Sequence, residues 1–265
     1  MSVNVSAIFL YPVKGLHGYP VERAFVERRG LRDDRRWMVV GPDGVFRTQR
    51  DHPVMATIRT SVDSSGLALM RPSSSVRVPL EPAGQEVAVQ VWKSTVLARF
   101  CSEEADRWLS GQLGEPVRLV KMGADSVRET SPQYSQPGDH VSFADGFPLL
   151  LASVASLEDL NSRMEVPVPM SRFRTNLVVA GSDPWAEDAW ARIRVGQVRF
   201  RYAKPCGRCS VTTVDQDTGL PMGDEPLRTL ATFRKVGNAV NFGANLIPDV
   251  EGWVGVGDAV STDQG

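Results

Sequence analysis

Short apolar stretches separated by turn residues dominate the first 100 residues and limit the folds that the chain can adopt. Val87, Val89 and Val91 alternate with polar side chains, a period of two that is typical of half-buried strands. Pro42-Asp43-Gly44 is a turn sequence, because Pro fixes φ and Gly accepts a positive φ. Several strands at such short spacing favour an antiparallel sheet or barrel. The strands expected in this part are residues 3–10, 36–40, 45–48, 58–62, 67–70, 87–91 and 95–100.

Helical signals are fewer. Ser102 can cap a helix over residues 103–113, and a second helix is predicted over residues 156–164. Pro226 has the features of a first-turn proline and predicts a third helix. Residues 123–140 are polar and rich in turn formers, as in a long surface loop or lid. Further strands are expected at residues 177–179, 193–195, 198–202, 210–214 and 254–260.

Together these elements predict a β-rich α+β protein with two β-barrel-like halves and a few short helices. We expect an N-terminal domain over residues 1–120 and a C-terminal domain over residues 121–265. A chain of 265 residues is long enough for each half to bury a core of its own.

The composition excludes several classes of function. A formal net charge of −1 gives no general attraction to nucleic acid or to anionic membranes. No apolar run approaches the length of a membrane span, and the N-terminus lacks the features of a secretory signal. Three cysteines, an odd number, argue against a disulfide framework and favour a reducing, cytoplasmic setting. The sequence contains no Walker phosphate loop, dinucleotide-binding loop or serine nucleophile elbow.

Cys206 and Cys209 form a Cys-x-x-Cys pair that is the strongest candidate for chemistry. Half a zinc site is one interpretation, but the third cysteine and the three histidines form no matching pair of further ligands. A redox pair would open a helix, whereas this pair lies between expected strands. Spacing alone leaves a third interpretation open, that of two incidental thiols. Lys204 and Arg208, with Arg201 as a further candidate, add positive charge beside the thiols, which favours thiolates and the ligation of a soft metal.

Residues 204–219 resemble the signature of MOSC domains, which are named after the C-terminal domain of molybdenum cofactor sulfurases. Residues 11–15 and 34–37 resemble the β-barrel domain that precedes the MOSC domain in many members. The resemblance covers nearly the whole chain and is strongest to the mitochondrial amidoxime-reducing components and their bacterial relatives. Further similar segments are residues 143–145, 155–161, 172–176 and 186–190.

The resemblance implies a set of site residues. The family's molybdenum-ligating cysteine corresponds to Cys209, which makes Cys206 a neighbour rather than a ligand. Asp145 corresponds to an acidic residue near the metal, suited to relaying protons or orienting water. The pterin and phosphate groups of the molybdenum cofactor need charge-assisted donors. The family binds them with basic and amide side chains, which here correspond to Lys14, Arg35, Arg174 and Asn176.

The resemblance also implies a reaction, the reduction of N-hydroxylated small molecules such as amidoximes, hydroxylamines and N-oxides. Electrons would come from a separate flavin, haem or iron–sulfur protein. We expect no pyridoxal phosphate, nucleic acid or membrane partner. The rival hypothesis is a protein that carries the cofactor or sulfur without turnover. A third hypothesis, a metal-free structural protein, would leave the cysteine pair without a function.

Three features depart from the family. The sequence shows no mitochondrial targeting segment or membrane anchor, unlike the eukaryotic relatives. No cysteine follows Cys209, so we expect no C-terminal iron–sulfur domain of the kind found in some bacterial relatives. Thr175 stands where relatives often have proline, within the segment implied to contact the cofactor.

Overall fold

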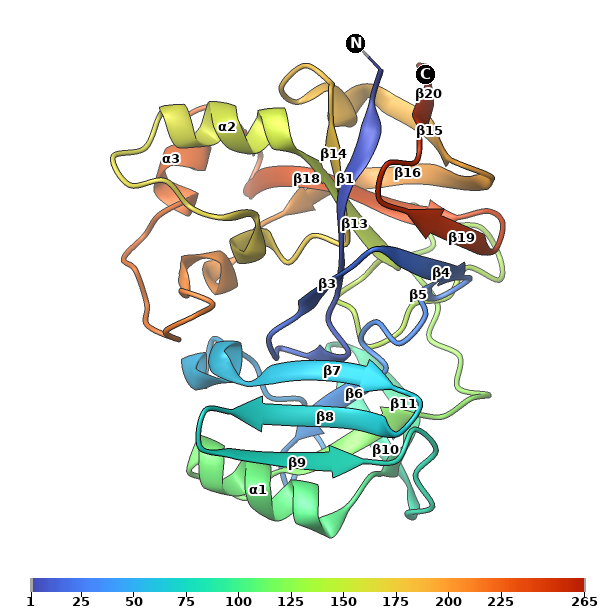
Figure 1. The fold of residues 1–265 in the computed structure, drawn as a ribbon, viewed down its shortest axis with the longest axis vertical. Coiled ribbons are helices and arrows are strands. Elements are labelled where there is room, and N and C mark those ends of the chain that lie inside the picture. Colours follow the sequence, from blue (N-terminus) through green and yellow to red (C-terminus); the bar gives the residue numbers. More distant parts are fainter. Residues whose placement is uncertain (1, 265) are drawn as a thin grey trace.

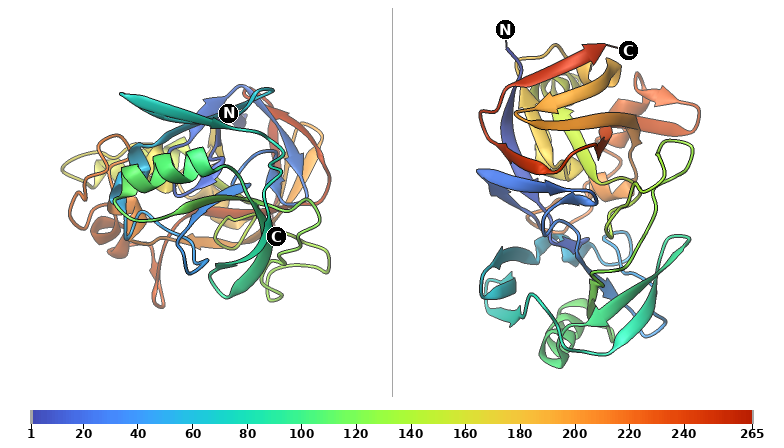
Figure 2. Two further views of the ribbon diagram at one scale, coloured as in Figure 1. Left: turned by 90° about the horizontal axis from the view of Figure 1, so that it is seen from below. Right: turned by 90° about the vertical axis from the view of Figure 1, so that its right-hand side faces the viewer.

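The computed structural model describes residues 2–264 as two sheet-rich halves with few helices (Figure 1). Both termini lie at one end of the long axis, and helix α1 (Glu103–Leu113) lies at the other (Figures 1 and 2). None of the sheets in the described residues closes on itself. The predicted β-rich α+β class with barrel-like halves is confirmed, as open rather than closed barrels.

The largest sheet combines both ends of the chain. Its nine strands are β1 (Asn4–Leu10), β3 (Tyr19–Val21), β13 (Leu149–Ser153), β14 (Leu177–Ala180), β15 (Trp190–Val195), β16 (Val198–Gly207), β17 (Lys235–Val236), β18 (Ala239–Pro248) and β20 (Val260–Gln264). Their order is β20-β15-β16-β18-β13-β14-β1-β3, and β17 pairs with β18. Ile8, Leu151 and Phe200 are among the fully buried residues of its core. Because β1 and β3 belong to this sheet, the domain division at residue 120 stays a prediction.

Three smaller sheets complete the protein. One contains β2 (Val13–Lys14), β6 (Trp37–Val40), β10 (Glu86–Val91), β11 (Ser94–Phe100) and β12 (Arg118–Met122). The second is a meander of β7 (Arg59–Asp63), β8 (Gly66–Arg71) and β9 (Ser74–Val78). The third contains β4 (Arg23–Glu27), β5 (Gly30–Leu31) and β19 (Gly252–Gly255). Helix α1 packs against β9 and β12 and closes the core of the N-terminal half.

Local signals determine where the helices begin. The Ser102 side chain accepts hydrogen bonds from two amides of the first turn of α1, and Gly114 ends this helix at φ 75°. Helix α2 (Val154–Ser162) begins two residues earlier than predicted, because Ser153 rather than Ser156 is its cap. Helix α3 (Leu227–Ala231) follows its proline as predicted. None of the helices within residues 2–264 has the length and apolar content needed to cross a bilayer.

Three expected strands are wrong. Residues 45–48 make only isolated bridges to neighbouring strands. Residues 210–214 begin as a 3₁₀ turn, η4 (Ser210–Thr213), because two threonine hydroxyls bond to carbonyls three residues earlier and so favour a turn. Residues 254–260 divide into the end of β19 and the start of β20, with Gly257 at φ 89° in the turn between them. The polar segment over residues 123–140 is a loop, as predicted.

Two substitutions test whether local sequence signals determine the stability of α1. Ser102→Ala removes the cap, so we expect the free energy of unfolding to fall by about 1 kcal/mol. Gly111→Ala, in the last turn, adds a Cβ that meets no atom within 4 Å. It should raise the free energy of unfolding by about 1 kcal/mol, because Ala loses less backbone entropy than Gly. Urea denaturation measures both, and a loss of stability in both variants would contradict this account.

Candidate functional site

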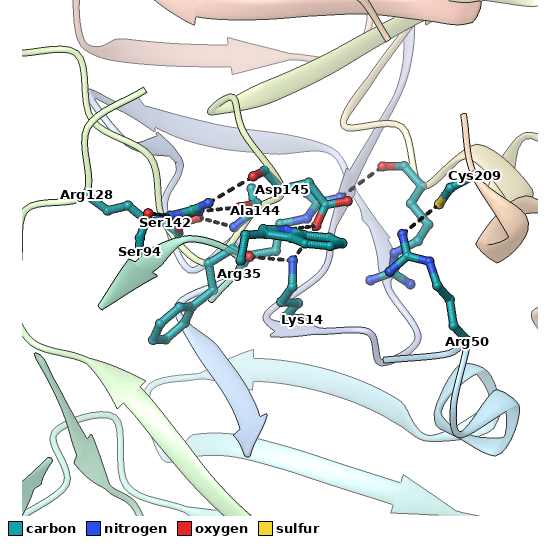
Figure 3. Close-up of polar contacts among 12 residues, drawn as sticks. Lys14, Arg35, Arg50, Ser94, Arg128, Ser142, Ala144, Asp145 and Cys209 are labelled. Carbon is teal, nitrogen blue, oxygen red and sulfur yellow. Dashed lines mark hydrogen bonds and ion pairs between the residues drawn. The ribbon is translucent and has the colours of Figure 1, made fainter. Parts of the chain in front are cut away.

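A cleft lies where the two halves meet. Both cysteines of the Cys-x-x-Cys pair line it, Cys206 as well as Cys209. Figure 3 shows Lys14, Arg35 and Asp145 close together, with Cys209 beside Arg50 at the other end. The structure therefore brings all the predicted site residues to one cavity, although their roles stay predictions. These residues are Lys14, Arg35, Asp145, Arg174, Asn176 and Cys209.

Arg35 connects the two halves at the base of this cleft. Its guanidinium donates to the Asp34 carboxylate, to Oδ1 of Asn176 at 3.0 Å and to the carbonyl of Arg174 at 3.0 Å. Asn176 Oδ1 also accepts from the amide of Leu150 at 3.2 Å, and its Nδ2 donates to the carbonyl of Phe9. Asn176 Oδ1 accepts two hydrogen bonds and one of the two Nδ2 hydrogens is engaged, so this side chain positions Arg35.

The ring of Tyr11 lies close to two guanidinium groups. The central carbon of Arg35 is 4.6 Å from the ring centroid, and that of Arg174 is 4.4 Å from it. Burial, and then the charge of Arg35, lower the pKa of Arg174 to about 10. Arg174 Nη1 donates to the carbonyl of Leu16, but its buried Nη2 has no partner among the described residues. An unpaired buried N–H donor costs free energy, which a hydrogen-bond acceptor placed next to it would recover.

Lys14 and Asp145 form an ion pair across the cleft. Lys14 is 8% exposed, and its ammonium also donates to the carbonyl of Phe143 at 2.9 Å. Burial lowers the pKa of Lys14, although the Asp145 charge opposes this. Desolvation raises the pKa of Asp145, but the Lys14 charge and hydrogen bonds from Lys14 and Trp92 outweigh it, so the net shift is downward. Asp145 is therefore a carboxylate near neutral pH, with the Lys14 side chain as its ion-pair partner.

Arg128 holds the backbone that carries Asp145. Its guanidinium donates to the carbonyls of Ser142 at 2.8 Å and Asp145 at 2.9 Å, and also to that of Ala144 (Figure 3). Arg128 is only 6% exposed, and it fixes three carbonyls within four residues of a segment without regular structure. Nothing in the sequence of the polar loop distinguishes this arginine from a solvated one.

The two thiols each accept a hydrogen bond from an arginine. Arg50 Nη2 lies 3.1 Å from Cys209 Sγ, and Arg208 Nη1 lies 2.9 Å from Cys206 Sγ. Cys206 lies within β16, whereas Cys209 follows the strand and precedes the η4 turn. Strand β16 therefore extends further than predicted and gives the two sulfurs different backbone environments. Arg50 lies two residues after the predicted strand over residues 45–48, and no motif distinguished it.

Two of the predicted charge contacts are wrong. The Lys204 ammonium lies over the ring of Tyr134, at 5.2 Å from its centroid, and not against a thiol. Arg201, also considered as a neighbour of the thiols, is bound to Asp139 and Asp249. Arg208 alone was placed correctly.

A zinc site finds no support in the described residues, which contain no cluster of three or more His, Cys, Asp or Glu side chains suited to a metal. Cys101 is separated from the pair, because it is buried in the core of the N-terminal half. Burial raises the pKa of its thiol and keeps it protonated.

Gln49 and Gln216 join the two halves beside the thiols. Each Nε2 donates to the Oε1 of the other, at 3.1 and 3.0 Å, and both side chains are almost fully buried. Gln49 also donates to the carbonyl of Gly15, and Gln216 to that of Val214. The pair therefore holds the segment that carries Arg50 against the segment that follows Cys209.

Comparison with known proteins agrees with this arrangement. Two family models match, the MOSC N-terminal beta barrel domain at residues 2–116 and the MOSC domain at residues 138–261. Mitochondrial amidoxime-reducing component 1 of Xenopus laevis is 33% identical over 97% of this chain and 81% of that protein. The chain belongs to the MOSC-domain family. The human protein of the same name is also 33% identical, over 97% of this chain and 82% of its own length.

Another relative of this MOSC protein is much longer than the chain. Molybdenum cofactor sulfurase of Arabidopsis thaliana is 29% identical over 98% of the chain, which corresponds to 35% of that protein. The family assignment therefore agrees with the resemblance found in the sequence, for both halves of the chain.

Disruption of the Gln49–Gln216 pair tests the contact between the two halves of the MOSC protein. Gln49→Ala leaves the buried Gln216 amide without its partner, so we expect a loss of about 1–3 kcal/mol in the free energy of unfolding. Gln216→Ala should cost a similar amount, and the double variant less than the sum, because the two side chains share one interaction. Gln85→Ala, at an exposed glutamine outside this contact, is the control with little expected change. Additive losses in urea denaturation would contradict a shared contact.

Tyr11 gives the site a measurable pH dependence. Burial raises the pKa of Tyr11 to about 12, above the value near 10 of an unfolded tyrosine. Its contribution to stability is complete below pH 10 and is lost as the pH rises from 10 to 12, because the unfolded state then releases its proton first. Tyr11→Phe should flatten the fall in unfolding free energy over this range. Identical pH profiles for the two proteins would contradict the raised pKa.

Proposed function

We propose that this MOSC protein is a molybdenum-cofactor-dependent reductase of N-hydroxylated compounds, with Cys209 as the protein's ligand to the metal. The observation that carries the proposal is a thiol at the end of a cleft whose other walls present cationic and amide donors. The names of its relatives, amidoxime-reducing components and a molybdenum cofactor sulfurase, support a function related to this cofactor.

The residues present fit the cofactor. Thiolate sulfur is a soft ligand suited to a metal such as molybdenum, and Cys209 Sγ faces the cleft. The unpartnered Nη2 of Arg174 is a donor for an anionic group, and Lys14 and Arg35 add positive charge next to it. In this proposal Arg174, Arg35 and Lys14 bind the phosphate and pterin, while Asn176 holds Arg35 in place.

In the proposed reaction the N–O bond of the substrate breaks, two electrons and two protons are consumed, and water is released. The cofactor, when bound, supplies the metal that exchanges the electrons and the oxygen atom. Asp145, with its lowered pKa, is a carboxylate near neutral pH and so orients water instead of donating a proton. The Lys14 ammonium is bound to the Asp145 carboxylate, and in this proposal it is the proton-bearing side chain nearest to that carboxylate.

The electron donor in this proposal is a separate flavin, haem or iron–sulfur protein. The cleft is open to solvent beside Asp145, whose side chain is 69% exposed, so a partner can approach it from this side. The cytoplasmic setting stays a prediction, since several relatives are named as mitochondrial.

The rival function is a carrier that holds the cofactor or sulfur without turnover. The presence of a second thiol, Cys206, in the same cleft favours this possibility over a structural role. The match to amidoxime-reducing components across both halves favours the reductase.

Paired cysteine variants test the proposed ligand. The protein is expressed in a host that makes molybdenum cofactor, and bound molybdenum, released pterin and reduction of benzamidoxime with a chemical donor are measured. Cys209→Ser should lose at least about 90% of the metal and of the turnover, because an alkoxide is a poorer soft ligand than a thiolate. Cys206→Ser is the matched control, because a serine hydroxyl at this position can still accept the hydrogen bond from Arg208. This variant should retain both the metal and the turnover.

The outcomes separate the alternatives. Stoichiometric molybdenum without turnover in the unmodified protein identifies the carrier. Full metal in Cys209→Ser with loss in Cys206→Ser shows that the assigned ligand is wrong. Absence of both metal and pterin from all three proteins refutes the proposed cofactor.

A further inference from the structure

Trp92 occupies a position where the backbone disfavours a large side chain. Strands β10 and β11 are joined by Trp92 and Lys93, between the paired residues Val91 and Ser94. Trp92 has φ 53°, at the first position of a two-residue turn where glycine is usual. A bulky residue with positive φ is strained, and such strain persists where other contacts hold it.

Contacts from both halves hold the indole at the cleft. Its Nε1 donates to Oδ1 of Asp145 at 3.2 Å, from the N-terminal half to the C-terminal half. Its ring packs on Phe46 with centroids 4.9 Å apart. Trp92 nevertheless remains 39% exposed and lines the cleft. The strained hairpin therefore presents a large, partly uncovered aromatic surface to the cavity.

This surface lies close to the proposed metal ligand. The guanidinium carbon of Arg50 is 5.2 Å from the Trp92 ring centroid, and Arg50 Nη2 is 3.1 Å from Cys209 Sγ (Figure 3). One guanidinium group thus connects the indole to the sulfur. The buried side chains deeper in the cleft, Lys14 and Asn176, are engaged with protein groups.

We propose that Trp92 determines the substrate preference of the site by binding planar conjugated N-hydroxylated compounds against its exposed indole. The inference rests on the proposed reductase function and adds its substrate class. Aromatic rings favour offset or edge-to-face contacts with other rings, and the nearby Arg50 adds a planar cation that can contact the same substrate face. A small aliphatic substrate has no ring to place against the indole, and so gains little from it.

The test compares benzamidoxime with acetamidoxime, which differ in the phenyl and methyl groups. Trp92→Gly removes the indole at a position whose φ suits glycine, so the hairpin is retained, and thermal melting checks this. We expect KM for benzamidoxime to rise about fivefold while KM for acetamidoxime changes by less than about twofold. Trp92→Phe keeps a ring but loses the hydrogen bond to Asp145, and should keep most of the preference for benzamidoxime.

Trp253→Ala is the matched control. Trp253 is 50% exposed and packs edge-on against Phe25 at 5.4 Å in the third sheet, and it does not line the cleft. Its removal should leave the ratio of the two KM values unchanged. Equal changes in KM for both substrates in Trp92→Gly, or none, would overturn the proposal.

Binding at equilibrium distinguishes this inference from the proposed function. Equilibrium dialysis of both amidoximes with the molybdenum-loaded protein needs no turnover. If the unmodified protein reduces neither compound but binds benzamidoxime more tightly, and Trp92→Gly loses that preference, the reductase proposal fails and the recognition by Trp92 stands. If the unmodified protein binds both compounds equally, the recognition by Trp92 is wrong, whatever the activity.

Discussion

The hydrogen bonds of the Arg35 guanidinium join the parts of the cleft that come from different ends of the chain. A buried cation needs several partners, and Arg35 has Asp34 on its own segment and Asn176 and the Arg174 carbonyl on the other half. Because Asn176 also binds β13 and β1, displacement of Arg35 would disturb the large sheet itself. The position of Arg35 at the cleft is therefore fixed by the same bonds that hold the fold.

This arrangement separates the cleft into two regions. Deep in it, Lys14 and Arg35 are largely buried and bound to protein groups, so they form a rigid cationic surface. Arg50 and Trp92 lie nearer to solvent and belong to the N-terminal half. Arg50 donates to Cys209 and Trp92 donates to Asp145, both of which belong to the C-terminal half. Rigid elements suit the binding of a cofactor, whereas partly exposed side chains suit the contact with changing substrates.

Sequence reasoning succeeded where a signal is local. The cap and the terminal glycine define α1, and one run of residues around Cys209 identified the family. It failed where long-range contacts decide. The segment after Cys209 contains β-branched residues typical of a strand, but its hydroxyls bond to nearby carbonyls and form a turn. Gln49, Arg50 and Trp92 gain their importance from partners more than 50 positions away, which no pattern in one sequence reveals.

The charges of the cleft link binding to stability. Arg35 and Arg174 both lie against one tyrosine ring, and their repulsion adds to burial in lowering the pKa of Arg174. The unpartnered Nη2 of Arg174 adds a further cost to the protein without a ligand. An anion bound there relieves both, and a ligand that binds only the folded state stabilises it in proportion to the logarithm of its concentration over Kd. The residues that weaken the free protein are therefore those that make the bound state favourable.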